Sequence, residues 1–198
     1  MALSTLDMWE TFYAQHQDER EWYVPTDVAM DSIKKIVSEI GKARPRLLHI
    51  GCGTSPLCEA IDKGLPHVQS IHTDFSERAI EVMKGRFAEM ELRCVDARSM
   101  GPEFLDRSQD VIVDVGVFDS MAMDSTKAKE NVGTMLREIL RVLERPGGVY
   151  LAFSLFGPEE RGHFLHIEGF QVTHTELKLS PLEMPHQPVT HVYVMRTT

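Results

Sequence analysis

The sequence predicts an α/β fold: a mostly parallel seven-stranded sheet with helices on both faces and an antiparallel pair of strands at one edge. Two observations support this prediction. Five short apolar segments alternate with amphipathic helical segments between residues 46 and 155, the pattern of parallel strands joined by helical crossovers. Two further segments, rich in β-branched and aromatic residues, follow with no helical pattern between them, which indicates an antiparallel pair.

Length and composition are consistent with that fold. The 198 residues, 42% hydrophobic and 26% charged, fit one globular domain, with an expected helical lead-in over 1–45 and a core over 46–198. The longest apolar run, Val149–Phe156, is far shorter than the roughly 20 residues that a membrane span needs. The net charge of −9 argues against a nucleic-acid partner and favours a basic protein or a cationic small molecule.

Helical segments are marked by apolar periodicity and by their end signals. Trp9 and Tyr13 are spaced as on one face of an N-terminal helix. Thr26 can cap a second helix that ends at Gly41. Ser55-Pro56 begins a third helix, which ends at Gly64, and Ser76 caps a fourth, whose apolar face includes Ile80 and Met83. A long amphipathic helix containing Val132, Leu136, Ile139, Leu140 and Leu143 ends before Pro146-Gly147-Gly148.

The predicted parallel strands are Arg46–Ile50, Val68–Thr73, Leu92–Val95, Val111–Asp114 and Val149–Leu155. The predicted antiparallel strands are Phe170–Lys178 and Val189–Arg196, joined by a loop that contains Pro181, Pro185 and Pro188. In such a sheet, ligands bind beyond the carboxyl ends of the parallel strands. The residues at those ends are therefore the first candidates for a functional site.

Glycines or aspartates lie at the carboxyl ends of the first four strands in order, and Asp114 ends the fourth. Gly51 and Gly53 come after the first strand, where missing side chains let the backbone approach a ligand. Asp74, 23 residues after Gly51, has the spacing of a carboxylate that accepts hydrogen bonds from ribose hydroxyls. Asp96, with the Ala97 amide beside it, can bind an exocyclic amine. This succession predicts a nucleoside-type ligand.

The type of nucleoside is restricted by two missing features. A dinucleotide fold needs a third glycine where this chain has Pro56, and no GxxxxGK[ST] phosphate loop is present. A ligand with adenine and ribose but no phosphate fits better, and S-adenosylmethionine is such a molecule. Its cationic sulfonium is favoured by acidic strand ends and aromatic faces. Asp114, which ends the fourth strand, lies beneath the expected reaction centre and is the candidate catalytic residue.

The stretches LLHIGCGTSPL, HTDFS, CVDARSM, DVIVDVGVFDSM and LREILRVLERPGGVY carry these residues. With them the sequence resembles the class I S-adenosylmethionine-dependent methyltransferases, which have a Rossmann-like fold. More narrowly, it resembles the branch that contains the elongation factor one-alpha lysine methyltransferases and citrate synthase lysine methyltransferase. Trp9-x-x-x-Tyr13 and Glu21-Trp22-Tyr23 match the aromatic lead-in of that branch. The resemblance extends from about Met8 to Arg196.

The resemblance implies the cofactor S-adenosyl-L-methionine and a set of residues that bind it. The implied cofactor-binding residues are Trp9, Tyr13, Trp22, Gly51, Gly53, Asp74, Phe75, Asp96, Ala97 and Val115. Among them, Asp74 would hold the ribose, and Phe75 would lie beside the adenine. Val115 replaces the lysine usual in this branch, and Val117-Phe118 replace Thr-Leu, so the acceptor channel differs from the pattern of the branch.

The implied activity is methylation of an amine, a lysine side chain or an N-terminus, on a protein substrate. A small-molecule methyltransferase, an aminopropyl transferase of the spermidine synthase type and a non-catalytic cofactor-binding partner subunit remain alternatives. An NAD oxidoreductase is disfavoured by Pro56. Retention of the aromatic lead-in favours the protein methyltransferase, acting on a basic protein or otherwise a small amine.

Other ionisable residues receive structural interpretations. Cys52, Cys58 and Cys94 have no metal-binding spacing, so no metal site is expected. His49 and His72 lie inside strands and are interpreted as core histidines. Asp119 and Asp124 are interpreted as surface charges, although both lie where an acceptor amine could approach. The three thiols indicate a reducing compartment. The acidic N-terminus is unlike an organellar transit peptide, so a cytoplasmic location is expected.

Overall fold

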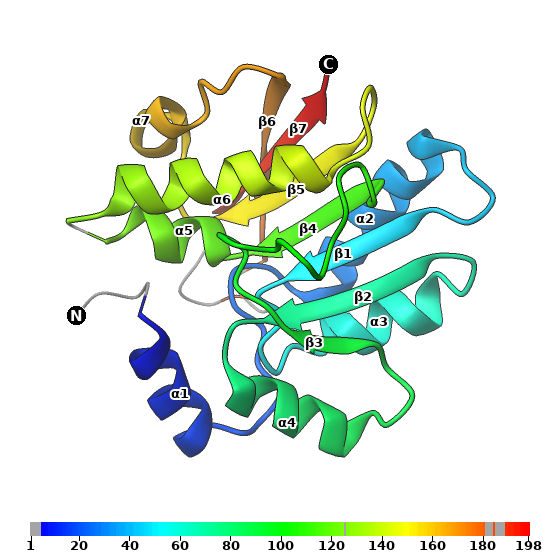
Figure 1. The fold of residues 1–198 in the computed structure, drawn as a ribbon, viewed down its shortest axis with the longest axis vertical. Helices are drawn as coiled ribbons and strands as arrows, with labels where there is room; N and C mark the ends of the chain where they lie inside the picture. The colour runs from blue at the N-terminus through cyan, green and yellow to red at the C-terminus, as the bar shows by residue number, and fades with distance from the viewer. Residues whose placement is uncertain (1–4, 125, 181–183, 185–188) are drawn as a thin grey trace.

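The computed structural model describes residues 5–124, 126–180, 184 and 189–198 of the chain. Within them, one seven-stranded sheet has the order β3-β2-β1-β4-β5-β7-β6 (Figure 1). The strands are β1 (Arg46–Ile50), β2 (Gln69–Asp74), β3 (Leu92–Cys94), β4 (Val111–Val115), β5 (Val149–Ser154), β6 (Phe170–Lys178) and β7 (Val189–Thr197). The first five are parallel, and β7 runs antiparallel to both β5 and β6. The predicted fold class is confirmed.

The helices are α1 (Leu6–Gln15), α2 (Thr26–Ile40), α3 (Leu57–Gly64), α4 (Glu77–Arg86), α5 (Val117–Ala122), α6 (Ala128–Val142), α7 (Pro158–Arg161) and the 3₁₀ helix η1 (Gly162–Phe164). The sequence did not predict α5, α7 or η1, because segments of three to six residues are too short to show a helical period. The predicted proline-containing loop, with Pro181, Pro185 and Pro188, lies outside the described residues.

Local signals set several helix ends as predicted. The Ser76 hydroxyl accepts a hydrogen bond from the Ala79 amide at 3.2 Å and caps α4. Gly41 ends α2 in the left-handed conformation, with φ of +67°. Thr26 was expected to cap α2 but is its first residue. Its amide donates instead to the Glu21 carboxylate at 2.7 Å, so a side chain from the preceding loop satisfies this helix end.

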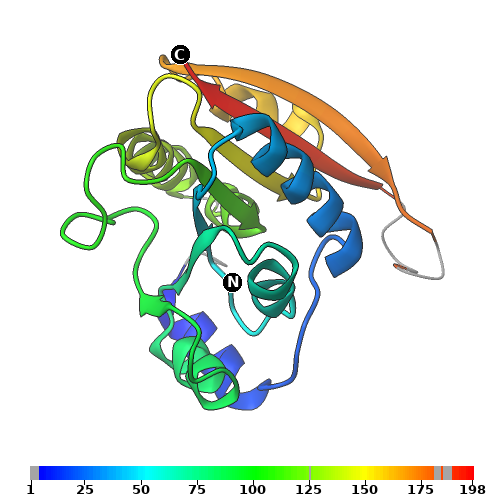
Figure 2. The same cartoon turned by 90° about the vertical axis from the view of Figure 1, so that its right-hand side faces the viewer.

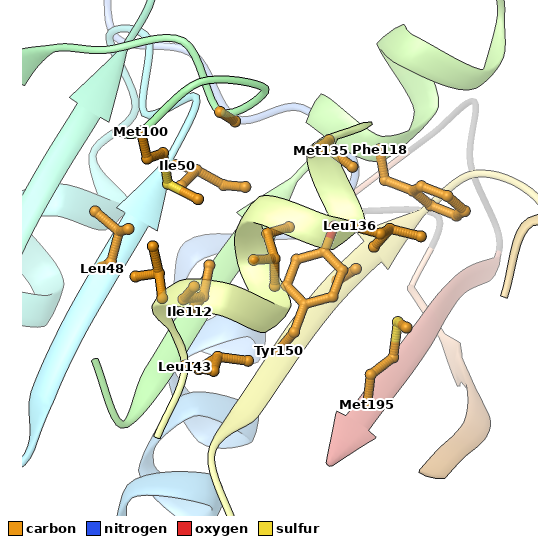
Figure 3. Packing of buried hydrophobic residues seen from close by; sticks show 14 of the residues in the cluster. Leu48, Ile50, Met100, Ile112, Phe118, Met135, Leu136, Leu143, Tyr150 and Met195 are labelled. Carbon is orange, nitrogen blue, oxygen red and sulfur yellow. The ribbon is translucent and has the colours of Figure 1, made fainter. Parts of the chain in front are cut away.

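Helices cover both faces of the sheet, and each face has its own apolar core. On one face, α6 packs over β1, β4, β5 and β7; Figure 3 shows Leu136 of this helix among Ile112 and Tyr150 of the strands. On the other face, α2 and α3 pack against the same central strands (Figure 2). Because neighbouring strand residues face opposite sides, Leu47 belongs to one core and Leu48 to the other.

The N-terminal helix α1 lies away from these layers. It contacts α4 beyond the edge where β1, β2, β3 and β4 end at their carboxyl termini (Figure 1). The loops that leave those strands therefore face α1. Among the helices in the described part of the chain, none combines the length and the apolar character that a membrane crossing requires.

Candidate active site

A cavity of about 990 Å³, its open mouth included, lies between α1 and the carboxyl ends of the parallel strands. Nine of the predicted site residues line it: Trp9, Tyr13, Trp22, Gly51, Asp74, Phe75, Asp96, Ala97 and Val115. The structure thus brings together residues that are up to 106 positions apart in the sequence, from position 9 to position 115. Eight further lining residues had no predicted cofactor role: Met8, Phe12, Tyr23, Val95, Gly116, Val117, Ser120 and Met121.

The glycine loop and Asp74 form the floor of the cavity. Asp74 accepts hydrogen bonds from the Gly53 amide and the Ser76 amide, each at 2.9 Å, so its carboxylate ties the first loop to the second. Burial raises the pKa of Asp74 to about 6, although the two amide donors act in the opposite direction. The carboxylate lies at the cavity wall and can accept further hydrogen bonds from a ligand.

The loop has no room for larger residues. Gly51 and Gly53 have φ of +60° and +50°, a conformation that side chains disfavour. A Cβ atom at Gly51 would collide with the side chain of Val117, and one at Gly53 would collide with the hydroxyl of Tyr13. Gly53 does not line the cavity itself but lies beneath Tyr13. The glycines thus let the loop fit closely between α1 and α5.

An aromatic wall built from α1 and the loop after it closes one side of the cavity. The rings of Trp9 and Tyr13 stack with centroids 5.7 Å apart, and Trp9 meets Trp22 edge-on at 5.6 Å. Phe12 lies 5.7 Å from Trp22, and the Arg20 guanidinium is 5.3 Å from the Phe12 ring. Helical spacing pointed to Trp9 and Tyr13 from the sequence. Phe12, three residues after Trp9, lies on the same helix face but was not selected.

Asp96 lies at the cavity with its carboxylate already paired. The Arg98 guanidinium donates to both carboxylate oxygens, from Nε at 3.0 and 3.1 Å and from Nη2 at 2.7 Å. The Arg98 amide adds a hydrogen bond at 2.8 Å. This pairing holds the side chain of Asp96 in one orientation beside Ala97. It was not predicted, because nothing in the sequence distinguishes Arg98 from the other basic residues.

Asp114, the predicted catalytic residue, is not among the lining residues. It is completely buried and accepts hydrogen bonds from the Tyr150 hydroxyl at 2.6 Å, the Val117 amide at 2.7 Å and the Phe118 amide at 2.9 Å. Burial raises the pKa of Asp114 to about 7 in spite of these donors. Its carboxylate holds the first turn of α5, and three residues of this helix, Val117, Ser120 and Met121, line the cavity.

Asp119 and Asp124 were expected to be surface charges, and this expectation was wrong. Asp119 is completely buried and accepts hydrogen bonds from the Ser154 hydroxyl at 2.7 Å and the Arg161 guanidinium at 2.9 Å. Asp124 is 6% exposed and accepts from the amide of Lys127, at the start of α6, at 3.0 Å. Both carboxylates are buried because each organises a helix end or a loop.

Tyr23 lines the cavity without a predicted role and packs against the backbone of Gly116. Gly116, with φ of +99°, lies against its ring, and a Cβ atom there would come within 2.9 Å of Cε2. Burial, together with the nearby carboxylates of Asp119 and Asp114, raises the pKa of Tyr23. Its hydroxyl therefore stays protonated. The Glu21-Trp22-Tyr23 motif drew attention to this segment, but nothing in it distinguished Tyr23 from Trp22.

Comparison with known proteins identifies the family. Residues 48–152, more than half of the chain, match the family model described as "Methyltransferase domain". The chain belongs to the S-adenosylmethionine-dependent methyltransferases. It is an enzyme of this class, and S-adenosylmethionine is its cofactor. The matched residues include the glycine loop and Asp74, Asp96 and Asp114.

Two groups of curated relatives are similar to this methyltransferase. The human eEF1A lysine and N-terminal methyltransferase is 35% identical over 158 residues, which cover 76% of this chain but only 21% of the human protein. The chain therefore spans about a fifth of that relative. The zebrafish citrate synthase-lysine N-methyltransferase, named as mitochondrial, is 28% identical over 188 residues, 84% of this chain and 73% of the relative.

Solved structures share the fold. The N-methyltransferase NodS from Bradyrhizobium japonicum, in complex with S-adenosyl-L-homocysteine, superposes with a TM-score of 0.68 at 17% identity. The alignment covers 98% of each chain. This likeness extends over the whole sheet and its helices.

The cavity fits an adenosine cofactor without phosphate. Its polar groups are few, and the carboxylate of Asp74 lies beside backbone amides at the end of a strand. The remaining wall consists mainly of aromatic and aliphatic side chains, which suit an adenine ring and attract a cationic sulfonium. Among the residues that line the cavity, none is a lysine or an arginine, the usual partners of a phosphate.

Proposed function

We propose that this methyltransferase transfers a methyl group to an amine of a protein substrate, either a lysine side chain or an N-terminal amine. The observation that carries this proposal is the similarity to the human eEF1A lysine and N-terminal methyltransferase, at 35% identity over 158 residues. The relatives named for citrate synthase lysine support the same acceptor chemistry. The aromatic cavity adds a physical reason, because such a wall favours an uncharged amine over an ammonium that has lost its water.

The predicted site residues are assigned to the cofactor by their positions around the cavity. Gly51 and Gly53 form the loop that approaches it, and Asp74 would accept hydrogen bonds from the ribose hydroxyls. The adenine would lie beside Phe75, with its edge at Asp96 and Ala97. The aromatic residues Trp9, Tyr13 and Trp22 would cover the methionine and adenosine parts, while Val115 borders the acceptor channel.

When bound, S-adenosylmethionine supplies a methyl group on a cationic sulfur, and an amine lone pair is the nucleophile that such a group requires. The protein's task is to align the acceptor and to keep water out, and alignment alone can supply several kcal/mol of rate enhancement. Free lysine has a pKa of about 10.4. Burial of the acceptor among Trp9, Tyr23 and Val115 favours its neutral form, because an apolar environment penalises the ammonium.

Asp114 is assigned a positioning role in this scheme. Its carboxylate holds the amides of Val117 and Phe118 and so fixes the first turn of α5. Val117 packs against Gly51 and also lines the cavity, so this turn shapes the place where cofactor and acceptor would meet. A group that is buried and occupied by three donors would act through α5 rather than on the reactants.

Methyl transfer in vitro tests the proposal. The enzyme is incubated with S-adenosylmethionine labelled in its methyl group and with a cell extract, elongation factor 1A or citrate synthase, and labelled residues are located by mass spectrometry. The expected result is label on a lysine or N-terminal amine, lost in the Asp74→Ala variant. Label found only in small amines, or aminopropyl transfer from the decarboxylated cofactor, would contradict the proposal.

The compartment is a separate proposal. We infer a cytoplasmic location, because the free thiols Cys52, Cys58 and Cys94 suit a reducing environment. Fractionation of cells that express the protein at its natural level tests this inference. Recovery with the mitochondria would contradict it and would agree with the location in the names of the citrate synthase-lysine methyltransferases.

A further inference from the structure

Two histidines and a cysteine converge in the core beneath the glycine loop, outside the cavity. His49 of β1 and His72 of β2 are paired neighbours in the sheet, and Cys58 lies in the first turn of α3. All three are at most 1% exposed. The Nδ1 atom of His49 lies 3.3 Å from Nδ1 of His72 and 3.6 Å from Sγ of Cys58. The three atoms all lie within 4.8 Å of one another.

These spacings match the edges of a tetrahedral zinc site. Bond lengths of about 2.0–2.1 Å to nitrogen and about 2.3 Å to sulfur place two nitrogens about 3.3 Å apart and a nitrogen and a sulfur about 3.6 Å apart at tetrahedral angles. Hydrogen bonds explain the cluster less well. Nδ1 of His49 carries at most one proton but faces both other atoms, whereas a central ion would bind all three lone pairs.

A carboxylate supports the orientation of one ring. Nε2 of His72 lies 3.0 Å from Oδ1 of Asp62, and the Ser70 hydroxyl donates to the same oxygen at 2.5 Å. With the Nε2 proton donated to Asp62, the lone pair of Nδ1 points toward His49 and Cys58. Metal-binding histidines commonly donate their second ring nitrogen to a carboxylate in this way.

We propose that His49, Cys58 and His72 bind a zinc ion. Structural zinc sites are almost always four-coordinate. The thiol of Cys52, 2% exposed, contacts that of Cys58 but is not among the atoms that lie within 4.8 Å of one another, so it would have to move to take the fourth position. The site is closed to solvent and has no opening to the cavity, so the role is structural. The ion would join β1, β2 and α3 around the glycine loop and so stabilise the loop that approaches the cofactor.

Sequence spacing did not predict this site, because its ligands come from two strands and a helix. His49 and His72 are 23 residues apart but lie opposite each other in the sheet. The expectation that both histidines lie in the core is correct, since both are buried. The proposed zinc site lies beneath the glycine loop, and it does not depend on which acceptor the enzyme methylates.

Metal analysis of the purified protein tests the site. The full chain is purified with a tag that contains no histidine and without chelators, equilibrated with zinc, freed of excess metal and analysed by mass spectrometry for zinc. Substitution with cobalt then reports the ligands, because a thiolate bound to tetrahedral cobalt gives a near-ultraviolet charge-transfer band and strong visible bands. The expected result is one ion per chain together with both sets of cobalt bands.

Variants separate the proposed ligands from other thiols. Cys58→Ser should remove the thiolate band and weaken zinc binding by more than about 100-fold, and Asp62→Asn should weaken it by about 10- to 100-fold. Cys94→Ser is the matched control, because Cys94 is an exposed thiol away from the cluster, and it should bind zinc normally. If Cys58→Ser fails to fold, three other measurements test the proposal. They are the zinc stoichiometry of the wild type, its cobalt spectrum and the zinc affinity of Asp62→Asn. A wild-type protein that takes up no zinc, or equal zinc binding by Cys58→Ser and wild type, would overturn the proposal.

Discussion

The single buried carboxylate of Asp74 serves two functions. It connects the glycine loop to the start of α4 through the amides of Gly53 and Ser76, and it faces the cavity where the cofactor's ribose is proposed to lie. Burial penalises its charge, whereas a ribose hydroxyl would be bound best by the ionised form. This conflict makes cofactor binding sensitive to pH.

Cofactor affinity should therefore fall as the pH drops below about 6, the pKa of Asp74. Well below that value the loss approaches about tenfold per pH unit, because protonation removes an acceptor for the ribose. Calorimetry with S-adenosylmethionine at pH 5, 6 and 7.5 measures this slope. Asp74→Asn should bind weakly at every pH with a reduced slope, and parallel curves for the two proteins would contradict the assignment.

In the absence of cofactor, the raised pKa of Asp74 gives the opposite pH dependence for the stability of the folded state. The native carboxyl keeps its proton between its unfolded pKa and about 6, so the native state binds more protons there. The contribution of Asp74 to the free energy of unfolding is therefore largest at low pH and declines as the pH rises through this window. Cofactor binding offsets that penalty at neutral pH.

A glycine comparison isolates the close contact beneath Tyr13. Gly53→Ala and Gly41→Ala both place a side chain at positive φ, +50° and +67°, and each should lose roughly 1–2 kcal/mol of stability. Only Gly53→Ala also collides with Tyr13, since the space around Gly41 is open. We expect cofactor affinity to fall at least about tenfold in Gly53→Ala, through displacement of the aromatic wall. Urea unfolding and calorimetry check both effects, and equal affinities would contradict this account of the loop.

At the level of elements, a buried ion pair joins α5 to α7. The Arg161 guanidinium donates to Asp119 at 2.9 Å, and the Leu155 amide donates to the same carboxylate at 2.8 Å. The side chains are 7% and 0% exposed, so neither charge is screened by water. The pair fixes the segment after β5 against the helix whose first turn forms part of the cavity wall.

Removing one charge of this pair should be costly. Arg161→Met should lower the free energy of unfolding by about 3–5 kcal/mol, because it leaves the Asp119 charge buried without a partner. Asp119→Asn combined with Arg161→Met should lose less than the sum of the two single variants. Urea unfolding of the four proteins measures the coupling. Additive losses would show that the two side chains do not stabilise each other.

Most elements of the fold were predictable because their signals are local. Apolar segments such as Val111–Asp114 predicted the strands, and Ser76 and Gly41 marked helix ends. The missed helix α5 depends on a distant group: Asp114 and the Tyr150 hydroxyl meet only once β4 and β5 are paired. Asp119 was misread for the same reason, since its partner Arg161 lies 42 positions further along the chain.

The site was predictable to a similar extent. Strand-end residues such as Asp74 and Asp96 could be selected from position alone, because parallel strands bring their carboxyl ends to one edge. The aromatic wall was found in part through the spacing of Trp9 and Tyr13. Contacts between residues far apart in the chain, such as Tyr23 against Gly116, could not be predicted because no local pattern in the sequence indicates them.

For the molecule as a whole, the decisive arrangement is the position of α1 across the end of the sheet. It converts a row of strand ends into a cavity with an aromatic wall (Figure 1). Both tryptophans of the chain, Trp9 and Trp22, line this cavity. The intrinsic tryptophan fluorescence of the protein therefore reports on this cavity.

Titration of the wild-type protein with S-adenosylmethionine, followed in parallel by tryptophan fluorescence and by calorimetry, tests whether this cavity is the cofactor site. We expect a saturable change in emission whose midpoint agrees with the calorimetric affinity, and no change with NAD. Asp74→Ala should abolish both signals at the same cofactor concentrations while its circular dichroism stays native. Calorimetric binding of S-adenosylmethionine with unaltered tryptophan emission, or undiminished binding by Asp74→Ala, would place the cofactor elsewhere and contradict the account.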